Sequence, residues 1–467
     1  MRILPVSAQD RIEKDSLGEI RVAAGALWGA QTQRAADNLR IGRDRMPAEL
    51  VRAIGLIKWA AAETNGELGE LPAPLAAAIA DAALEIAAGR HAEQFPLGVY
   101  QTGSGTSTNM NVNEVIAHLA SRGLVKAVHP NDHVNRCQSS NDVIPTAIHV
   151  AAALALRDRL LPALHGLAAS IGAKAGEVGD QVKPGRTHLM DALPVTVGQE
   201  MTAWKSQVED AIARIEAART RVHRLALGAT AVGTGVNAHP AFANGAIARL
   251  GARTGLPFTG APDRFASLAA QDTAVELSGT LRGAAVVLLK IANDLRWMNS
   301  GPLAGLAEIA LPALQPGSSI MPGKINPVIP EAVAMAATAV MARDASVGMA
   351  GASGNFQLNV MLPLIADAVL ESIGLLADSS AALAERVIPG ITVNAARISE
   401  SLARNPMLLT ALAPRIGYDR AAAIAKRAAT ESRPILEIAV EESGLPRDEL
   451  ARLLDPLRLA RGDGSGS

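Results

Sequence analysis

The strongest constraint on the fold is a stripe of apolar residues that repeats every three or four positions between residues 201 and 225. Its members are Met201, Trp204, Val208, Ala211, Ile215, Ala218, Val222 and Leu225. No charged residue interrupts this apolar seam, whereas many of the positions between its members are charged. The pattern predicts a long helix that packs nearly parallel to its neighbours. A self-associating helical bundle is compatible with it.

Three further stretches predict long helices, at about 144–174, 273–298 and 364–387. Together with the apolar seam they indicate a central long-helix bundle domain over residues 140–390. No alternation of strand with helix points to a parallel sheet, so the expected fold class is mainly α.

The flanking regions contain shorter predicted elements. Helices are expected at about 47–64 and 73–88, within an N-terminal, mainly helical domain of residues 1–139. A small C-terminal helical domain is expected at 391–461. The Gly/Ser-rich residues 462–467 predict a flexible tail.

Composition excludes several classes of partner. Hydrophobic residues make up 49% of the 467 residues, enough to bury a core without disulfides or metals. The 44 basic and 45 acidic residues nearly cancel, and no basic cluster carries interleaved aromatic rings, so nucleic acid is not an expected partner. Cys137 is the single cysteine, which fits a reducing cytosol. The first residues contain no long apolar stretch of the secretory kind, so a cytoplasmic location is expected.

The longest charge-free stretch, residues 345–366, has the length of a membrane span. It contains three glycines, two asparagines, a glutamine and a proline. These residues predict a loop entering a helix, so no membrane partner is expected.

Four segments rich in Ser, Thr, Asn and Gly interrupt a sequence that is otherwise rich in Ala and Leu. They cover residues 101–114, 129–142, 185–192 and 316–327. Each one alone is equally well explained as a helix cap or a connection. Together they offer many hydroxyl and amide donors and one cation, Lys324, with little acid, a set that suits a small anionic substrate.

The last polar segment contains the most specific motif. Residues 317–327 read Gly-Ser-Ser-Ile-Met-Pro-Gly-Lys-Ile-Asn-Pro and resemble the signature loop of the fumarase/aspartase superfamily. The resemblance extends over nearly the whole chain and is closest to class II fumarases in order and spacing. The further matching segments are 27–34, 102–106, 138–142, 185–188 and 351–356. It implies a three-domain fold whose central helices assemble into a tetrameric helical core.

The resemblance implies reversible hydration of fumarate to (S)-malate in the tricarboxylic acid cycle, through an aci-carboxylate intermediate. This chemistry needs a positioned base, a proton donor or acceptor for the water, and donors around a carboxylate whose charge increases. Carried over from the family, Ser318 is the base, and His188 supported by Glu331 handles the water. No cofactor is implied, and each active site of the homotetramer draws on three subunits.

The resemblance also assigns two groups of binding residues. The substrate carboxylates are expected to contact Ser104, Gly105, Thr106, Ser139, Ser140, Asn141, Thr187, Ser319, Lys324, Ile325 and Asn326. A second anion site is expected at His129, Pro130, Asn131 and Asp132. Some relatives carry Arg where this chain has Lys126.

Two patterns that suggest other ligands are rejected. His129, Asp132 and His133 have no third His or Cys nearby, and Pro130 interrupts a helical face, so no metal is expected. The glycine-containing run 233–238 follows a predicted long helix instead of a strand, so it is not a dinucleotide fingerprint.

Two alternatives to the hydratase remain. Aspartate ammonia-lyases usually carry Gln at the position of His188, Ala at that of Gly323 and Gly-Gly-Ala-Gly at 102–105, so this chain resembles a fumarase at each position. Other fumarate-releasing lyases fit less well, because the resemblance includes 28–31 and 354–356. A non-catalytic structural protein of the same fold would be free to lose His188, Ser318 or Lys324, and all three are present.

Overall fold

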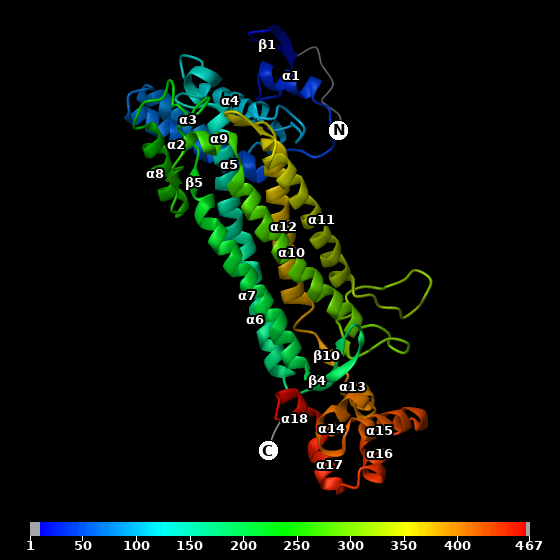
Figure 1. Ribbon diagram of the computed structural model, residues 1–467. Helices are drawn as coiled ribbons and strands as arrows, with labels where there is room; N and C mark the ends of the chain where they lie inside the picture. Colours follow the sequence, from blue (N-terminus) through cyan, green and yellow to red (C-terminus); the bar gives the residue numbers. More distant parts are fainter. Residues whose placement is uncertain (1–9, 123, 464–467) are drawn as a thin grey trace. The chain divides into compact units, whose positions relative to one another are not determined.

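The structure is a computed structural model that describes residues 10–122 and 124–463. The predicted tail therefore lies outside the described residues from position 464 on. The α-helices are α1 (Ala30–Asn38), α2 (Ala48–Glu67), α3 (Ala73–Ala87), α4 (Thr106–Ser121), α5 (Ser140–Ala155), α6 (Leu161–Glu177), α7 (Val197–Val222), α8 (Phe242–Thr254), α9 (Arg264–Ala269), α10 (Asp272–Met298), α11 (Val328–Gly351), α12 (Leu362–Arg386), α13 (Ala395–Ala403), α14 (Ala413–Ile416), α15 (Tyr418–Glu431), α16 (Ile435–Glu442), α17 (Arg447–Leu453) and α18 (Pro456–Arg461). The predicted mainly α fold is confirmed (Figure 1).

The long helices agree with the sequence pattern in all but two respects. Helices α7, α10 and α12 match the predicted stretches, and the shorter α2 and α3 do so as well. The helix expected at 144–174 consists of α5, a π-helical turn, η3 (Leu156–Leu160), and α6. Helix α11 was not predicted.

The apolar seam is buried as its spacing predicts. Each of its eight members is at most 2% exposed, and Trp204 at its centre is fully buried. The indole Nε1 of Trp204 donates a hydrogen bond to Asp294 Oδ2 on α10 over 3.0 Å, which satisfies its one polar atom. The seam from Met201 to Val222 thus forms a packed face of α7, and its last member, Leu225, lies just beyond the helix.

The described residues form two compact units. Unit 1 comprises the residues up to Pro162, Ala213–Ala285 and Ala337–Ala377, and unit 2 comprises Ala163–Ile212, Val286–Ala336 and the residues from Asp378 on. Both units collect segments that are far apart in the sequence. The three domains expected along the chain therefore stay a prediction.

In unit 1, α2 is the central packing element and contacts α3, α5 and α8. Leu50, Ile54 and Ile57 follow one another at helical spacing on α2 and are fully buried. Helix α5 begins at a capping box. The Asp142 carboxylate accepts from the backbone N–H of Ser139, and the Ser139 hydroxyl accepts from a backbone N–H in the first turn of the helix. This cap fixes where the chain turns into α5.

In unit 2, the helices α14–α18 and the turn before them enclose a small separate core of buried leucine, isoleucine and alanine side chains, among them Leu412, Ile424, Ile438 and Leu450. Figure 1 shows α14–α17 grouped together. Helix α18 packs on strand β4 of the same unit.

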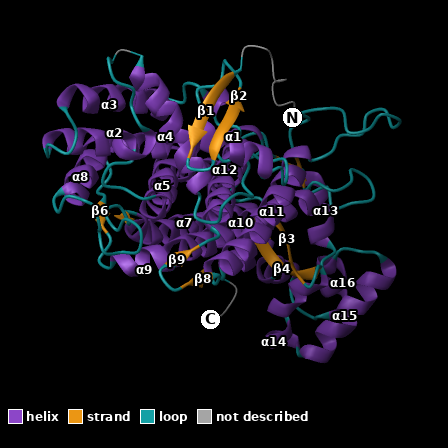
Figure 2. Ribbon diagram, turned by 90° about the horizontal axis from the view of Figure 1, so that it is seen from above, coloured by secondary structure: helices purple, strands orange, loops and turns teal. Residues whose placement is uncertain are grey.

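The strands are short and occur in pairs, which the mainly helical prediction did not include. They are β1 (Arg11–Asp15), β2 (Gly18–Val22), β3 (Val182–Thr187), β4 (Met190–Thr196), β5 (Arg224–Leu225), β6 (Thr259–Gly260), β7 (Ile309–Ala310), β8 (Gly354–Asn355), β9 (Leu358–Asn359) and β10 (Thr392–Val393). β1–β2, β3–β4, β8–β9 and β7–β10 are antiparallel, and β5–β6 is parallel. Figure 2 shows β1–β2 and β3–β4, the two longest pairs.

The charge-free stretch 345–366 forms the end of α11, the β8–β9 hairpin and the start of α12, as a loop entering a helix. Within the described ranges, none of the helices combines the length and the apolarity that crossing a bilayer requires.

Candidate active site

The signature loop, residues 316–327, lies in unit 2 and is closed by hydrogen bonds between its two ends. Gly317 N donates to Lys324 O over 2.8 Å, and Asn326 Nδ2 donates to Gly317 O over 2.8 Å. A Cβ atom at Gly317 would lie 2.6 Å from Lys324 O, so this close approach requires glycine. The loop therefore holds Ser318 and Lys324 on one closed turn.

Ser318 sits where backbone donors converge. Its Oγ accepts hydrogen bonds from the backbone N–H groups of Ile320 over 3.2 Å and Met321 over 3.0 Å. Two N–H groups aimed at one oxygen stabilise negative charge on that oxygen. Lys324 Nζ donates to Asn326 Oδ1 over 2.8 Å, so the one cation of the loop also has a fixed partner.

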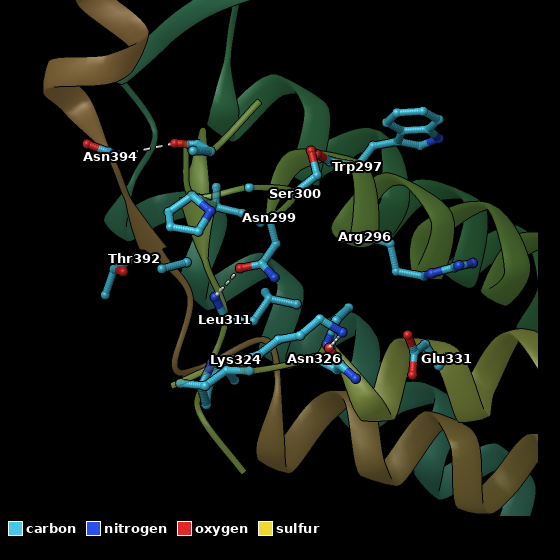
Figure 3. A pocket seen from close by; sticks show the side chains of 18 of the residues that line it. Arg296, Trp297, Asn299, Ser300, Leu311, Lys324, Asn326, Glu331, Thr392 and Asn394 are labelled. Carbon is cyan, nitrogen blue, oxygen red and sulfur yellow. Dashed lines mark hydrogen bonds between the residues drawn. The ribbon is translucent and has the colours of Figure 1, made fainter. Parts of the chain in front are cut away.

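A pocket in unit 2 brings together four of the predicted residues, Lys324, Ile325, Asn326 and Glu331. Figure 3 shows Asn326 between Lys324 and Glu331, with Arg296 above Glu331. Ser318 and Ser319 are not among the residues that line this pocket. The lining carries two cations and one carboxylate near the loop, which suits an anionic ligand.

Several lining residues were missed by the sequence analysis. They are contributed by the end of α10, the loop after it and β10, and include Arg296, Asn299, Ser300, Thr392 and Asn394. Asn299 Oδ1 accepts from Leu311 N over 3.0 Å, and Asn394 Nδ2 donates to Ala307 O over 3.1 Å. These contacts hold the 299–312 loop. In the sequence, the polar run Asn-Ser-Gly-Pro at 299–302 could have indicated that this loop contributes to a binding site.

Thr187 and His188 lie at the tip of the β3–β4 hairpin, also in unit 2. His188 and Leu189 form its two-residue turn with φ of 56° and 61°, the left-handed values that such a turn requires. Within one chain both Thr187 and His188 are exposed, and Glu331 is half-buried. A buried His188–Glu331 pair therefore stays a prediction for the assembled protein.

A buried ionic cluster holds the base of this hairpin. The Glu308 carboxylate, 3% exposed, pairs with Arg186 and lies 2.9 Å from Lys183 Nζ. Lys183 Nζ, also buried, lies 2.7 Å from Glu200. Buried charges of this kind are tolerated only when they are paired. The cluster thus fixes the strand that leads to His188.

Unit 1 carries the other predicted substrate-binding residues on the first turns of two helices. Ser104 Oγ and Thr106 Oγ1 are 2.8 Å apart at the start of α4, where Gly105 caps the helix with φ of 71°. Gly103 lies so close to Val360 that a Cβ atom would meet the backbone oxygen at 1.7 Å. This contact sets the position of the Ser104–Thr106 turn.

Ser139, Ser140 and Asn141 open helix α5. Asn141 Nδ2 donates to Ala231 O over 2.8 Å, and Asp142 accepts from the N–H groups of Gly228 and Thr230, both at 2.9 Å. Burial raises the pKa of the Asp142 carboxyl, and the backbone donors oppose that shift. The N–H groups at a helix start favour an anion.

The predicted second anion site lies beside a second pocket, in unit 1. His129, Pro130 and Asn131 line it together with cationic residues that the sequence analysis missed, Arg11, Lys14 and Arg122. His129 caps a π-helical turn, η2 (Pro130–Val134), and its Nδ1 accepts from Asp132 N over 3.1 Å. Asp132 itself is exposed. Among residues 10–122 and 124–463, no group of three or more His, Cys, Asp or Glu side chains could hold a metal ion.

Two protein-family models match the chain. The one described as Lyase matches residues 18–342, and the one described as Fumarase C C-terminus matches residues 408–461. A protein of Xylella fastidiosa named "Fumarate hydratase class II" is 58% identical over 452 residues, which cover 97% of this chain and 96% of that protein. The chain belongs to the class II fumarate hydratase family.

Solved structures of similar proteins share the fold of this chain. A class II fumarase from Schistosoma mansoni has a TM-score of 0.93 at 37% identity, covering 97% of this chain and 99% of that one. A fumarate lyase:delta crystallin from Brucella melitensis, bound to cobalt, has a TM-score of 0.91 at 43% identity and the same coverage. The expected fumarase/aspartase-like fold is confirmed.

Proposed function

We propose that this chain adds water reversibly to fumarate to give (S)-malate, as a metal-independent hydro-lyase of the tricarboxylic acid cycle. The observation that carries the proposal is the signature loop, in which Ser318 Oγ accepts hydrogen bonds from two backbone N–H groups and which also carries the Lys324 cation. The full-length similarity to proteins named class II fumarate hydratase supports the same reaction.

Ser318 acts on the carbon that carries the exchanged proton. In the direction of malate dehydration, the Ser318 alkoxide removes the C3 proton, and the electron pair moves into the adjacent carboxylate as an aci-carboxylate. A serine alkoxide needs donors that stabilise its charge, and the N–H groups of Ile320 and Met321 are oriented for this role. In hydration, the Ser318 hydroxyl returns the proton to carbon.

His188, with Glu331, acts on the water. In hydration the imidazole accepts a proton from the water as its oxygen bonds to C2, and in dehydration it returns the proton to the departing hydroxide. A carboxylate beside the ring fixes its tautomer and raises its basicity. The exposed hairpin tip would place the ring against a neighbouring subunit.

The substrate carboxylates are bound by uncharged donors and one cation. Hydroxyl and amide groups give direction, and Lys324 gives charge. The proposed binding residues are Ser104, Gly105, Thr106, Ser139, Ser140, Asn141, Thr187, Ser319, Lys324, Ile325 and Asn326. The second anion site is proposed at His129, Pro130, Asn131 and Asp132, where Arg11, Lys14 and Arg122 supply positive charge to the adjoining pocket.

The active protein is proposed to be a cytoplasmic homotetramer whose active sites are shared between subunits. Exposed apolar residues on α11, Met335 and Met349, support an assembly, since they are 69% and 72% exposed in one chain. Light scattering should give a tetramer. A stable and fully active monomer would contradict this part of the proposal.

The test of the reaction follows the ultraviolet absorbance of fumarate with purified protein, a chelator and no ammonia. Rapid loss of absorbance with formation of malate is expected. Loss only after ammonia is added would indicate an aspartate ammonia-lyase. No loss under either condition would indicate another fumarate-releasing lyase or a non-catalytic protein of this fold.

A further inference from the structure

A fully buried lysine lies beneath the proposed substrate-binding turn of unit 1, and the proposed mechanism does not use it. Lys58 on α2 is 0% exposed. Its Nζ donates to Asn135 Oδ1 over 2.8 Å and to Gln138 Oε1 over 2.9 Å. Burying an ammonium group costs much free energy, so a lysine placed here needs a reason beyond packing.

Lys58 fixes which way the two amides point. An ammonium group only donates hydrogen bonds, so Asn135 and Gln138 must turn their oxygens toward it. Their nitrogens bond in the opposite sense: Asn135 Nδ2 donates to Gln138 O over 3.2 Å, and Gln138 Nε2 donates to Arg136 O over 2.9 Å. The orientation of both amides is therefore determined.

The orientation of the Asn135 amide in turn determines the orientation of the Asn109 amide on α4. Asn135 Oδ1 also accepts from Asn109 Nδ2 over 3.3 Å. The same nitrogen donates to Ser140 Oγ over 3.0 Å. Both hydrogens of the Asn109 amide nitrogen are thus used, one toward Asn135 and one toward Ser140.

Ser140 is left with a defined hydrogen-bonding direction. Its Oγ accepts from Asn109, and a hydroxyl that accepts on one side is free to donate its own hydrogen on another. Within residues 10–122 and 124–463, no acceptor for that hydrogen is found. A donor without a partner at the start of α5 is what a carboxylate requires.

We propose that Lys58 is a positioning residue for the substrate site, acting through Asn135 and Asn109 to orient the Ser140 hydroxyl as a donor to a substrate carboxylate. This inference rests on the proposed function, because it takes Ser140 as a substrate-binding residue. In this relay, Lys58 and Asn109 both donate to Asn135 Oδ1, and Asn109 also donates to Ser140 Oγ, so a buried cation is linked to the proposed substrate site.

The test is a double-mutant cycle on the binding of fumarate. Lys58→Met keeps the length of the side chain and removes its donors, and Asn109→Leu removes the last link before Ser140. Each variant should raise KM about tenfold, the loss of one hydrogen bond to a charged group, and change kcat much less. The double variant should have the KM of Asn109→Leu alone, since both changes break one relay.

A purely structural role predicts different results. The proposal would be overturned if the double variant raised KM by the product of the two single effects. It would also be overturned if the variants lowered kcat and the thermal midpoint but left KM unchanged. Lys174→Met is the matched control, because Lys174 is also buried but pairs with Glu177 and Ile391 O instead of a proposed site residue. Its KM should equal that of the wild type.

A second variant guards against poor folding of Lys58→Met. Asn109→Asp keeps the size of the side chain but replaces the donor by an acceptor, so the Ser140 hydrogen would turn inward. Its KM should rise, and an unchanged KM would overturn the proposal.

Calorimetry with succinate as the probe gives the same comparison without turnover. If the wild type does not hydrate fumarate, the proposed function fails, and succinate affinities alone decide the relay: weaker binding by the variants supports it, equal binding overturns it.

Discussion

Ser318 Oγ accepts a hydrogen bond from the backbone N–H of Met321 over 3.0 Å, within a loop whose two ends are joined by hydrogen bonds. The oxygen proposed as the base is thus held by the backbone and does not depend on a neighbouring side chain. Ser318→Ala should lower kcat by about 10²- to 10⁴-fold, as loss of a general base does, with little change in thermal midpoint. Steady-state fumarate hydration measures the loss.

A matched serine serves as the control for Ser318→Ala. Ser401 lies on α13, and its Oγ donates to Arg397 O over 2.8 Å. Ser401→Ala should keep wild-type turnover. Unchanged turnover in Ser318→Ala itself would remove Ser318 from the mechanism.

His188 combines a proposed catalytic role with an uncommon backbone conformation, and a substitution has to respect both. Asparagine tolerates the left-handed φ of 56° better than most residues, so His188→Asn should keep the hairpin turn. We expect kcat for hydration to fall by about 10²- to 10⁴-fold because no group then accepts the proton of water. Circular dichroism and the thermal midpoint should stay at wild-type values; a parallel loss of structure would make the defect one of folding.

Glu308 should be critical for stability, since it neutralises two cations at the base of the His188 hairpin. Glu308→Gln would leave Arg186 and the buried Lys183 with too little negative charge. Removing one member of a buried ionic cluster costs about 3–5 kcal/mol, so chemical denaturation should show a loss of that order. Glu437→Gln removes a half-exposed partner of Arg433 and should change stability by less than about 0.5 kcal/mol. Equal losses in both variants would contradict the role of Glu308.

The charge of Lys58 should make stability depend on pH. Burial lowers the pKa of Lys58 from its ordinary 10.5 to about 7, and the Asp142 carboxylate opposes the shift. The unfolded chain therefore binds more protons than the folded chain between these two values, so this group makes the folded state more stable as pH rises through that window. The thermal midpoint of the wild type, relative to Lys58→Met, should rise from pH 6 to pH 9. A constant difference would show that Lys58 keeps its charge.

Neutral Lys58 still carries two N–H donors, one for each amide oxygen that it contacts. The orientation of Asn135 and Gln138 should therefore survive deprotonation. Loss of the side-chain donors, and not loss of the charge, is what disturbs the Ser140 hydroxyl.

The sequence predicted the helices in which the apolar residues lie on one face and that face is buried. The seam of α7 is such a case, because its flanks are charged and only one face reads as apolar. Helix α11 was missed because apolar residues lie on both faces: Val333 and Val340 are buried, but Met335 and Met349 are exposed. With no polar face, the helical period is hidden.

The site residues could be named only through resemblance to a family, since their segments are far apart in the sequence. The β3–β4 hairpin was read as a connection, because its turn consists of His188 and Leu189 instead of the usual Asn-Gly pair. Arg296 and Asn394 line the pocket beside the signature loop but belong to no motif. Lys58 is one lysine in an apolar helix, and only its burial marks it as unusual.

The proposed sharing of the active site between subunits gives the last prediction. Ser318→Ala and His188→Asn should each be inactive alone, because each lacks one of the two groups that move protons. If one site takes Ser318 from one subunit and His188 from another, mixed tetramers contain some sites with both groups intact. Random mixing of equal amounts, after dissociation and reassembly, should restore about a quarter of wild-type activity, the product of two even chances in a symmetric assembly.

The controls for this experiment separate subunit sharing from simple refolding. Each variant dissociated and reassembled by itself should stay inactive, and the double variant mixed with the wild type should add no activity beyond that of the wild-type subunits. If the mixture of single variants regains activity and these controls do not, Ser318 and His188 of one site must come from different chains. A mixture that stays inactive although light scattering shows mixed tetramers would mean that one chain supplies both groups.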